Sequence, residues 1–509
     1  MKKLRRYGII MVAIVPLLLF IHGQIQLQTT RHNLQKLSEF TYILQLVKSN
    51  WVQEVDLDTL IDFAIQGMLK SLDPHSAYLT PEGTEELTIQ SKGKYGGLGI
   101  QIGIRDGWLT VIAPIEGTPA DRAGMRPGDR IIKIEGVSTK GITLQEAVKK
   151  LRGDPGTKVT ITVERPGMKE PFDLTITRAI IEIKSVPYYG VLEDDIGYIR
   201  LAHFDGGAAD EVRKAVDDLR SKGVRKFILD LRSNPGGLLK EAVNVADIFI
   251  GKDSLVVSVQ GRNPSINRDY KATQPGPPPW PVVVLVDRGS ASASEIVSGA
   301  IQDWERGVIL GDTTFGKGSV QHIFRVTGDR VLKLTTALYY TPSGRCIHRT
   351  DTLRYLLRVP TAKDTFYTLG KRHRPQVGGG GIIPDIVHET RYVSPIVDKI
   401  MRKGLFLTFG ARYAREHTEL KPGFDLSDDV LENFKSELRA HDVEFADSEF
   451  VAHKDEIKLR LKMAIAETKW GSAGRYEVWL KADPWVNEAI EILKASETLD
   501  DLFEQASRY

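Results

Sequence analysis

Apolar positions in the N-terminal part of the chain recur at helical spacing. They lie three or four residues apart between residues 34 and 47, and again between residues 61 and 69. This spacing is typical of amphipathic helices, so two are expected there. Asp73-Pro74-His75 then interrupts the pattern, as a turn would.

Between residues 95 and 165 the pattern changes to short alternating segments separated by glycine turns. Alternation of apolar and polar residues predicts strands, and helical spacing after a capping residue predicts helices. The expected strands are 98–104, 108–112, 130–134 and 159–163, with a short helix at 118–124 and a second one at 144–151. This part should be a small β-rich domain.

From residue 190 to 395, strands and helices alternate. The segments 226–231, 255–259 and 282–286 are almost wholly apolar, and residues 238–250 have helical spacing. Continuous apolar strands followed by helices predict a sheet with both faces covered. Residues 345–381 are basic and irregular. They are expected to form either a flexible loop near the functional site or a solvent-exposed surface loop.

Beyond Ser394 the sequence is mainly helical in pattern and charged. Trp470, Trp479 and Trp485 lie within its last 40 residues, an aromatic content that disordered tails lack. The chain is therefore expected to be a multidomain α/β protein with a folded helical extension of open role. The expected divisions are 1–30, 31–92, 93–168, 169–395 and 396–509, with 31–92 belonging to the core formed by 169–395.

The first 30 residues indicate that the protein is located outside the cytoplasm. Lys2, Lys3, Arg5 and Arg6 precede an apolar run over 7–21, and a basic cluster before such a run marks a secretory signal or a signal anchor. No small-residue cleavage site follows, so an uncleaved anchor in the cytoplasmic membrane is favoured over a cleaved signal, and both over a buried helix. The rest of the chain is then expected in the cell envelope, either anchored in the membrane and facing the periplasm or secreted into the periplasm.

Charge and cysteine content exclude several classes of function. Lysine and arginine total 69 against 66 acidic residues, a net charge of +3, which makes nucleic acid an improbable partner. The single cysteine, Cys346, excludes an internal disulfide framework and a cysteine-based metal cluster. No metal and no cofactor are expected.

Two segments carry candidate chemistry: 287–296, which follows an apolar strand, and 314–321. Ser292 and Glu295 fit the S-x-x-E capping box, so Ser292 is either only a helix cap or a nucleophile. At a helix start, backbone N–H groups can stabilise the oxyanion formed when a hydroxyl attacks a carbonyl.

A serine nucleophile requires a base, and Lys317 is the candidate. A lysine can act as a base when burial keeps it neutral, because desolvation lowers a lysine pKa. Gly316 and Gly318 would allow close approach of other backbone to Lys317. Gln321, four residues on in an extended segment, would share a face with Lys317 and could hold its amine without adding charge.

These segments resemble those of the C-terminal processing (tail-specific) proteases, a serine peptidase family with a Ser–Lys dyad. The resemblance covers about 35–395 and includes Leu72–Leu79, Leu229–Gly237 and Gly381–Asp385. It implies Ser292 as nucleophile rather than Ser290 or Ser294, Lys317 as base and Gln321 as its orienting residue, with the family's usual interval of 25 residues between nucleophile and base. It also implies Gly237 and Ala293 as oxyanion donors, with Gly236 as a close alternative to Gly237.

The β-rich unit at about 93–168 resembles a PDZ domain through its Gly-Leu-Gly-Ile loop, its Ala-Gly-x-x-x-Gly-Asp turn and the later helix. Consecutive N–H groups of a glycine loop can hold a carboxylate, and an adjacent strand edge can accept a peptide. Gly97, Leu98, Gly99 and Ile100 are therefore expected to bind a substrate's C-terminus. Arg152 is either a relay from this unit to the protease core or a solvated helix-end arginine.

Three other interpretations compete with this one. Residues 311–318 nearly match the P-loop G-x-x-x-x-G-K-[ST], but Gly318 replaces the hydroxyl residue and a strand is expected after Lys317. A PDZ scaffold with an inactive hydrolase domain would be expected to lack one or more catalytic residues, and none of the candidate residues is missing. A periplasmic peptidase that trims damaged proteins generally is the alternative within enzymes. Further partners left open are a second copy of the chain and an adaptor protein.

Overall fold

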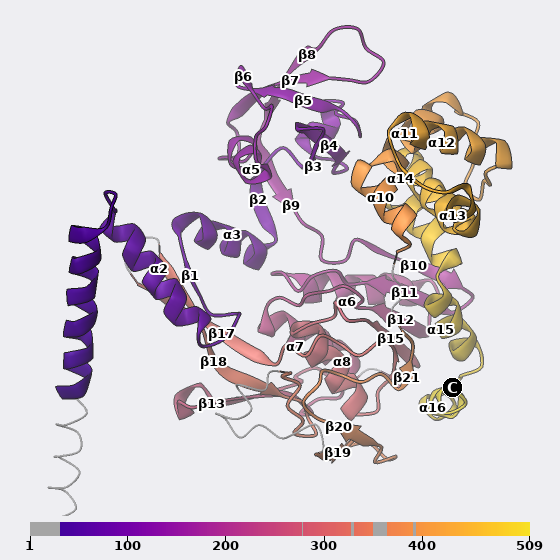
Figure 1. Cartoon of the computed structure of the whole chain (residues 1–509). Coiled ribbons are helices and arrows are strands. Elements are labelled where there is room, and N and C mark those ends of the chain that lie inside the picture. Colours follow the sequence, from indigo (N-terminus) through magenta and orange to yellow (C-terminus); the bar gives the residue numbers. More distant parts are fainter. Residues whose placement is uncertain (1–30, 277, 327–329, 350–363, 390–392) are drawn as a thin grey trace, which may run out of the picture. The chain divides into compact units, whose positions relative to one another are not determined.

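The computed structural model describes residues 31–276, 278–326, 330–349, 364–389 and 393–509 (Figure 1). These residues form two compact units. The first holds the described residues up to Pro81 together with Gln321–Thr335, and the second holds Glu82–Val320 with Thr336–Tyr509. Two strands, β17 (Ser319–Arg325) and β18 (Val331–Tyr340), contribute residues to both units.

The first unit contains the two helices expected from the N-terminal pattern. Residues 31–50 are helical, and α2 (Leu57–Lys70) begins after Asp56, whose side chain accepts a hydrogen bond from Thr59 N–H. The short strand β1 (Ala77–Leu79) pairs antiparallel with the start of β18. No helix in the described part of the chain is long and apolar enough to cross a membrane, and the predicted anchor at 1–30 lies outside the described residues.

The β-rich unit has the strands and helices expected of it. Its sheet has the order β3-β4-β5-β7-β8, with β6 beside β5, so β3 is an edge strand. Alternate apolar side chains such as Val111, Ile131 and Ile161 are buried in its own core. The bounds are β3 (Ile100–Arg105), β4 (Trp108–Pro114), α4 (Pro119–Arg122), β5 (Arg130–Ile134), β6 (Val137–Ser138), α5 (Leu144–Leu151), β7 (Lys158–Glu164) and β8 (Phe172–Thr177). Before and after it lie α3 (Pro81–Lys92) and the ribbon of β2 (Lys94–Gly97) and β9 (Ala179–Glu182).

The second unit is built around a sheet of order β10-β11-β12-β15-β16-β21. The strands from β11 to β21 are parallel, and β10 adds an antiparallel edge. Successive residues of β15 face opposite sides, so Val284 and Val286 pack on one core while Val283 and Leu285 pack on another. The bounds are β10 (Tyr188–Glu193), β11 (Ile196–Arg200), β12 (Lys226–Asp230), β15 (Val282–Val286), β16 (Val308–Gly311) and β21 (Ile386–Val387).

Helices from distant parts of the sequence cover the two faces. On one face lie α6 (Ala208–Ser221), α7 (Leu239–Phe249) and α8 (Ala293–Asp303), which share a core with the sheet. On the other lie α15 (Pro484–Lys494) and α16 (Leu499–Ala506), with the end of α14 (Lys454–Ala482). The last helices of the extension therefore cover one face of the central sheet, which agrees with the α/β fold expected from the strand pattern.

The rest of the extension has a core of its own. Phe409, Phe434 and Leu461 lie fully buried in it. This confirms that the chain beyond Ser394 is helical and folded. The helices are α10 (Pro395–Lys403), α11 (Leu405–Glu416), α12 (Asp428–Ala440), α13 (Asp447–Ala452) and the first part of α14.

Residues 345–381 are less irregular than expected. Residues 350–363 lie outside the described chain. Arg345, Cys346, Ile347 and His348 are buried, whereas Tyr367, Leu369 and Val377 are exposed, so only the start of the segment is withdrawn from solvent. A small antiparallel ribbon, β19 (Thr365–Tyr367) with β20 (Pro375–Val377), replaces the expected irregular structure. The remaining elements are β13 (Leu255–Gly261), a 3₁₀ turn over Pro264–Ile266 and β14 (Arg268–Lys271), with β13 paired to both β14 and the end of β18.

Candidate active site

Ser292 lies at the turn between β15 and α8, as the sequence predicted. It is the N-cap residue of α8, with φ of 55° and ψ of −109°, a conformation that non-glycine residues adopt only at a cost of about 1–3 kcal/mol. Its side chain is 8% exposed. A hydroxyl held at the positive end of a helix in a strained turn is suited to attack a bound carbonyl.

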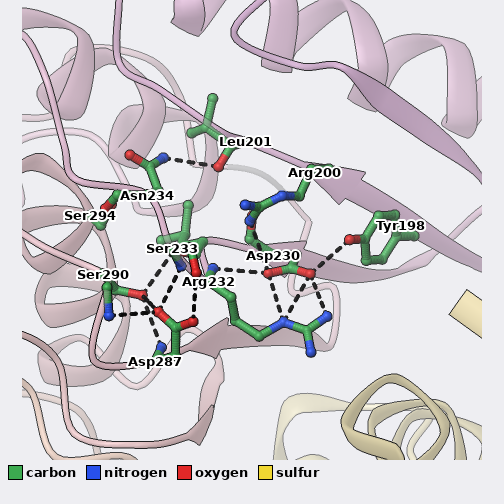
Figure 2. A network of polar contacts seen from close by, with 12 residues as sticks. Tyr198, Arg200, Leu201, Asp230, Arg232, Ser233, Asn234, Asp287, Ser290 and Ser294 are labelled. Atoms are coloured by element: carbon green, nitrogen blue, oxygen red, sulfur yellow. Dashed lines mark hydrogen bonds and ion pairs between the residues drawn. The ribbon is translucent and has the colours of Figure 1, made fainter. Parts of the chain in front are cut away.

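The two neighbouring serines have structural roles. Ser290 Oγ donates to Leu231 O at 2.8 Å and Ser294 Oγ donates to Asn234 O at 2.9 Å. Both side chains are completely buried. These two bonds join the segment around Ser292 to the turn after β12. Asn234 Nδ2 in turn donates to Leu201 O, which ties that turn to the end of β11 (Figure 2).

That turn brings the predicted oxyanion donors beside Ser292. A side-chain carbon placed on Gly236 would lie 2.9 Å from both Ala293 N and Ser292 Cβ, so only glycine fits there. Gly236 N–H already donates to Asn234 Oδ1 at 2.9 Å. Within the described chain, the N–H groups of Gly237 and Ala293 donate to no other protein group. The geometry therefore favours Gly237 over Gly236 as the first donor.

Lys317 lies on the loop between β16 and β17, which is anchored to the nucleophile segment. Phe315 N–H donates to Ser290 O at 3.0 Å, and Arg349 N–H donates to Gly316 O at 3.0 Å. A side-chain carbon on Gly318 would lie 2.8 Å from His348 N. The glycines beside Lys317 thus permit the close backbone approach that was expected, and the buried start of the 345–381 segment lies against this loop.

Glu295 connects the two candidate catalytic residues. Its Oε2 accepts hydrogen bonds from Ser292 N–H at 2.7 Å and from Lys317 N–H at 2.9 Å. Its Oε1 accepts from Thr314 Oγ1 at 2.6 Å and from Gly316 N–H at 2.7 Å. Burial raises the pKa of this carboxyl against the opposing effect of these donors. Sequence reasoning identified Glu295 only as a capping-box partner and missed its contact with the lysine loop.

Gln321 belongs to the first unit. Its Nε2 donates to Thr335 Oγ1 at 3.2 Å, and Thr335 Oγ1 donates to Asp73 Oδ1 at 3.1 Å. Asp73 also accepts from the N–H groups of His75 and Ser76. The 72–79 signature therefore forms a turn that supports Gln321 through Thr335. The proposed contact of Gln321 with Lys317 stays a prediction.

A buried charge cluster holds the strand that leads into the oxyanion turn. Asp230, fully buried, accepts from Tyr198 Oη at 2.7 Å, from Arg232 Nη2 at 2.6 Å and from Arg200 Nη1 at 3.2 Å (Figure 2). Burial alone would raise the pKa of Asp230, but the two arginines outweigh it and lower the pKa to about 2. Arg232 Nη1 also donates to Asp483 Oδ2 at 2.7 Å. Asp483 caps α15, so the C-terminal helices are tied to this strand.

In the β-rich domain, the four residues predicted to bind peptide run from the last residue of β2, Gly97, to the first residue of the edge strand β3, Ile100. Gly99 has φ of 77°, and a side-chain carbon there would lie 2.3 Å from Thr118 Cβ, so the turn requires glycine. Ala120 N–H donates to Leu98 O and Ile115 N–H donates to Gly99 O. These bonds take up the carbonyls of the loop and fix its entry into β3.

Arg152 is the C-cap residue of α5, and its side chain makes contacts with other elements. Its Nη1 donates to Glu86 Oε2 of α3 at 2.6 Å, and its guanidinium lies 4.8 Å from the centre of the Tyr95 ring. Its side chain is 25% exposed. The predicted relay role of Arg152 remains a prediction.

The structure also bears on the P-loop interpretation. A P-loop needs a helix after its lysine, whereas the residues that follow Lys317 form strand β17. Residues 311–318 therefore do not have the loop-to-helix structure that a nucleotide-binding P-loop requires.

Comparisons with known proteins agree with the architecture. Residues 195–353 match the model of peptidase family S41, residues 110–165 match the PDZ domain, and residues 21–83 match the activating protease CtpB N-terminal domain. A carboxy-terminal-processing protease of Bartonella bacilliformis is 40% identical over 397 residues, covering 77% of this chain and 82% of that protein.

The carboxy-terminal processing protease CtpA of Bacillus subtilis is 35% identical over 355 residues, covering 68% of this chain and 76% of that protein. A solved photosystem II D1 C-terminal processing protease is 26% identical with a TM-score of 0.38, covering 69% of this chain and 92% of that one. The matches confirm the resemblance seen in the sequence: the chain belongs to the carboxy-terminal processing proteases of peptidase family S41, and it carries a PDZ domain.

Proposed function

We propose that the protein is an endopeptidase of serine type that binds the C-terminal tail of a protein substrate and cleaves near it. The observation that carries this proposal is the shared acceptor Glu295 Oε2, which receives the N–H groups of Ser292 and Lys317. It links the backbones of two residues, 25 apart in the sequence, that carry a hydroxyl and an amine.

In the proposed reaction, Ser292 Oγ attacks the scissile carbonyl while its proton passes to the amine of Lys317. The N–H groups of Gly237 and Ala293 would stabilise the oxyanion, because they lie beside the nucleophile and donate to no other group of the described chain. The ammonium of Lys317 then protonates the leaving amine, and water releases the acyl group by the reverse path. Because the base must be neutral, cleavage should rise with pH.

The PDZ domain supplies tail recognition. A substrate's terminal carboxylate would meet N–H groups of the loop 97–100, and the last few residues would pair with the free edge of β3. Binding energy gained there is remote from the scissile bond and can be used to position it.

We place this activity outside the cytoplasmic membrane, because a basic cluster and an apolar run open the sequence. A second copy of the chain is a further proposed partner. The helix over 31–50 carries Leu34, Leu37 and Phe40 at 60%, 63% and 47% exposure, which is the kind of apolar stripe that helices use to associate.

Cleavage of one unstructured peptide in two forms, with a free and with an amidated C-terminus, tests the proposal. Amidation removes the charge and leaves every residue near the cut in place. We expect kcat/KM to fall at least tenfold, which is about 1.4 kcal/mol. Equal cleavage of both forms would favour a general trimming peptidase, and cleavage of neither would favour a scaffold.

A further inference from the structure

The helical extension reaches the carboxyl ends of the central strands, where the candidate catalytic segments begin. Strand β12 leads into the oxyanion turn (residues 232–237), β15 into the segment of Ser292 and β16 into the loop of Lys317. Open parallel sheets form their sites at this edge, because the carboxyl ends of the strands meet there. The junction between α14 and α15, residues 479–485, lies against two of these three strand ends.

Arg232 opens the oxyanion turn, and the junction encloses its side chain. Its Nη1 donates to Asp483 Oδ2 at 2.7 Å, and its guanidinium lies 5.0 Å from the ring centre of Trp479 and 5.6 Å from that of Trp485. Its Nε and Nη2 donate to Asp230 Oδ2 at 3.1 and 2.6 Å. A planar guanidinium can bind two carboxylates and lie over aromatic rings at once, which a lysine ammonium cannot do.

The junction also lies close to the start of the lysine loop. Gly311 is the last residue of β16, and a side-chain carbon on it would lie 3.0 Å from Cζ3 of Trp485. Trp485 is buried in the core that α15 shares with β15 and β16. Lys317 follows Gly311 after six residues. One indole therefore lies beside both Arg232 and the strand end that leads to the candidate base.

The oxyanion turn is short and internally bonded, so a shift of its first residue is carried to its donor. Asn234 N–H donates to Leu231 O at 3.2 Å, and Asn234 Oδ1 accepts from Gly236 N–H at 2.9 Å. Gly237, the favoured oxyanion donor, lies five residues after Arg232. Supporting contacts of this kind fix the geometry of catalytic groups that they do not themselves join.

We propose that Arg232 is a positioning residue, through which the α14–α15 junction aligns the oxyanion turn. The proposal rests on the function proposed above, and it gives the helical extension a role in the activity of the site as well as in folding. Arg232 acts through the N–H group of Gly237, whose distance from the developing oxyanion determines how much the transition state is stabilised.

Asp483→Ser separates this role from the capping of α15. Asp483 Oδ1 accepts from Trp485 N–H at 3.0 Å and from Val486 N–H at 3.2 Å, whereas Oδ2 accepts from Arg232. Serine is also a favoured N-cap residue, but its single oxygen cannot replace the second carboxylate oxygen. The variant therefore keeps a helix cap and removes the link to Arg232.

Lys226→Met is the matched control, because it breaks the other link between the extension and β12. Lys226 Nζ donates to Glu497 Oε1 at 2.8 Å, and its side chain is 5% exposed. Lys226 is the first residue of β12, so this link lies at the end of the strand remote from the oxyanion turn. Its loss should lower stability without shifting Gly237.

The test measures kcat and KM for a tail peptide, the rate of labelling by a fluorophosphonate, and Tm, all in the full chain. For Asp483→Ser we expect kcat and the labelling rate to fall together by about tenfold to a hundredfold, with KM unchanged. Labelling responds because the phosphonyl oxygen occupies the oxyanion site. Lys226→Met should lower Tm and keep the wild-type kcat and labelling rate.

Wild-type kcat and labelling in Asp483→Ser would overturn the proposal, as would a rise in KM alone or an equal loss of kcat in Lys226→Met. If Asp483→Ser does not fold, Arg232→Lys, which keeps a positive charge beside Asp230, is measured in its place. A loss of kcat and labelling then supports the role, and wild-type values overturn it. Full activity of Ser292→Ala would instead refute the proposed nucleophile, which separates the two failures.

Discussion

Glu295→Gln is the substitution that examines the architecture of the site most sharply. It is nearly isosteric, yet it replaces an acceptor for four hydrogen bonds by a group with one oxygen and one NH₂. The Glu295 carboxylate receives Ser292 N–H and Lys317 N–H on one oxygen, and Thr314 Oγ1 and Gly316 N–H on the other. In the variant, one of these pairs must face an NH₂ group.

The magnitude follows from those contacts. A hydrogen bond to a charged group contributes about 1.5–3 kcal/mol, so two lost acceptors correspond to about 3–6 kcal/mol. Part of this is recovered, because the burial that raises the pKa of Glu295 no longer acts on a neutral amide. We expect a loss in the free energy of unfolding of about 2–4 kcal/mol. A shift of about 1 Å between nucleophile and base would reduce kcat about a hundredfold.

The assay is peptide cleavage at a temperature where the variant is folded, with Glu241→Gln as control. Glu241 is also a buried glutamate, and its Oε2 accepts from Ala209 N–H at 3.0 Å, a donor that lies outside both candidate segments. Glu241→Gln should lose stability and keep kcat. If Glu295→Gln retains kcat within threefold of wild type, or loses no more than Glu241→Gln, Glu295 does not align the dyad.

Three further outcomes are expected. Asp230→Asn should have a smaller free energy of unfolding than the wild-type protein. This difference should shrink by about 2 kcal/mol as the pH falls from about 4 to about 2, because a carboxyl with a lowered pKa stabilises the fold only while it is ionised. A difference independent of pH would contradict this origin. Gly99→Ala should abolish the preference for a free C-terminus and leave cleavage of the amide unchanged, because the added carbon would lie 2.3 Å from Thr118 Cβ; a retained preference would show that the loop does not read tails. Arg345→Ala should destabilise the fold by about 3–5 kcal/mol in urea unfolding, since it leaves Asp303 buried without its ion-pair partner, and a loss below about 1 kcal/mol would show that the pair is not needed.

Local sequence patterns were sufficient to predict most of the helices and strands. The apolar run 282–286 is β15, and the capped helical pattern 144–151 is α5, because burial period and capping chemistry act over a few residues. The packing of α15 and α16 on the central sheet could not be predicted in this way. It depends on contacts such as that of Arg232 with Asp483, 251 residues apart, which no local pattern encodes.

The same distinction applies to the site. Ser292 was placed at a strand-to-helix turn because its neighbours carry capping and strand signals. The structural roles of Ser290 and Ser294 depend on the carbonyls of Leu231 and Asn234, to which their hydroxyls donate. Those acceptors belong to a distant segment, so only the family resemblance could favour Ser292 over its two neighbours as the candidate nucleophile.

Identification of the residue that forms a covalent adduct tests the central claim most directly. The full chain is treated with a fluorophosphonate until peptide cleavage stops, and the adduct is located by mass spectrometry of the digested protein. We expect a single adduct on Ser292, with Ser290 and Ser294 unmodified because both are buried and hydrogen-bonded. An adduct on another residue, or complete modification of Ser292 that leaves cleavage of the tail peptide unchanged, would contradict it.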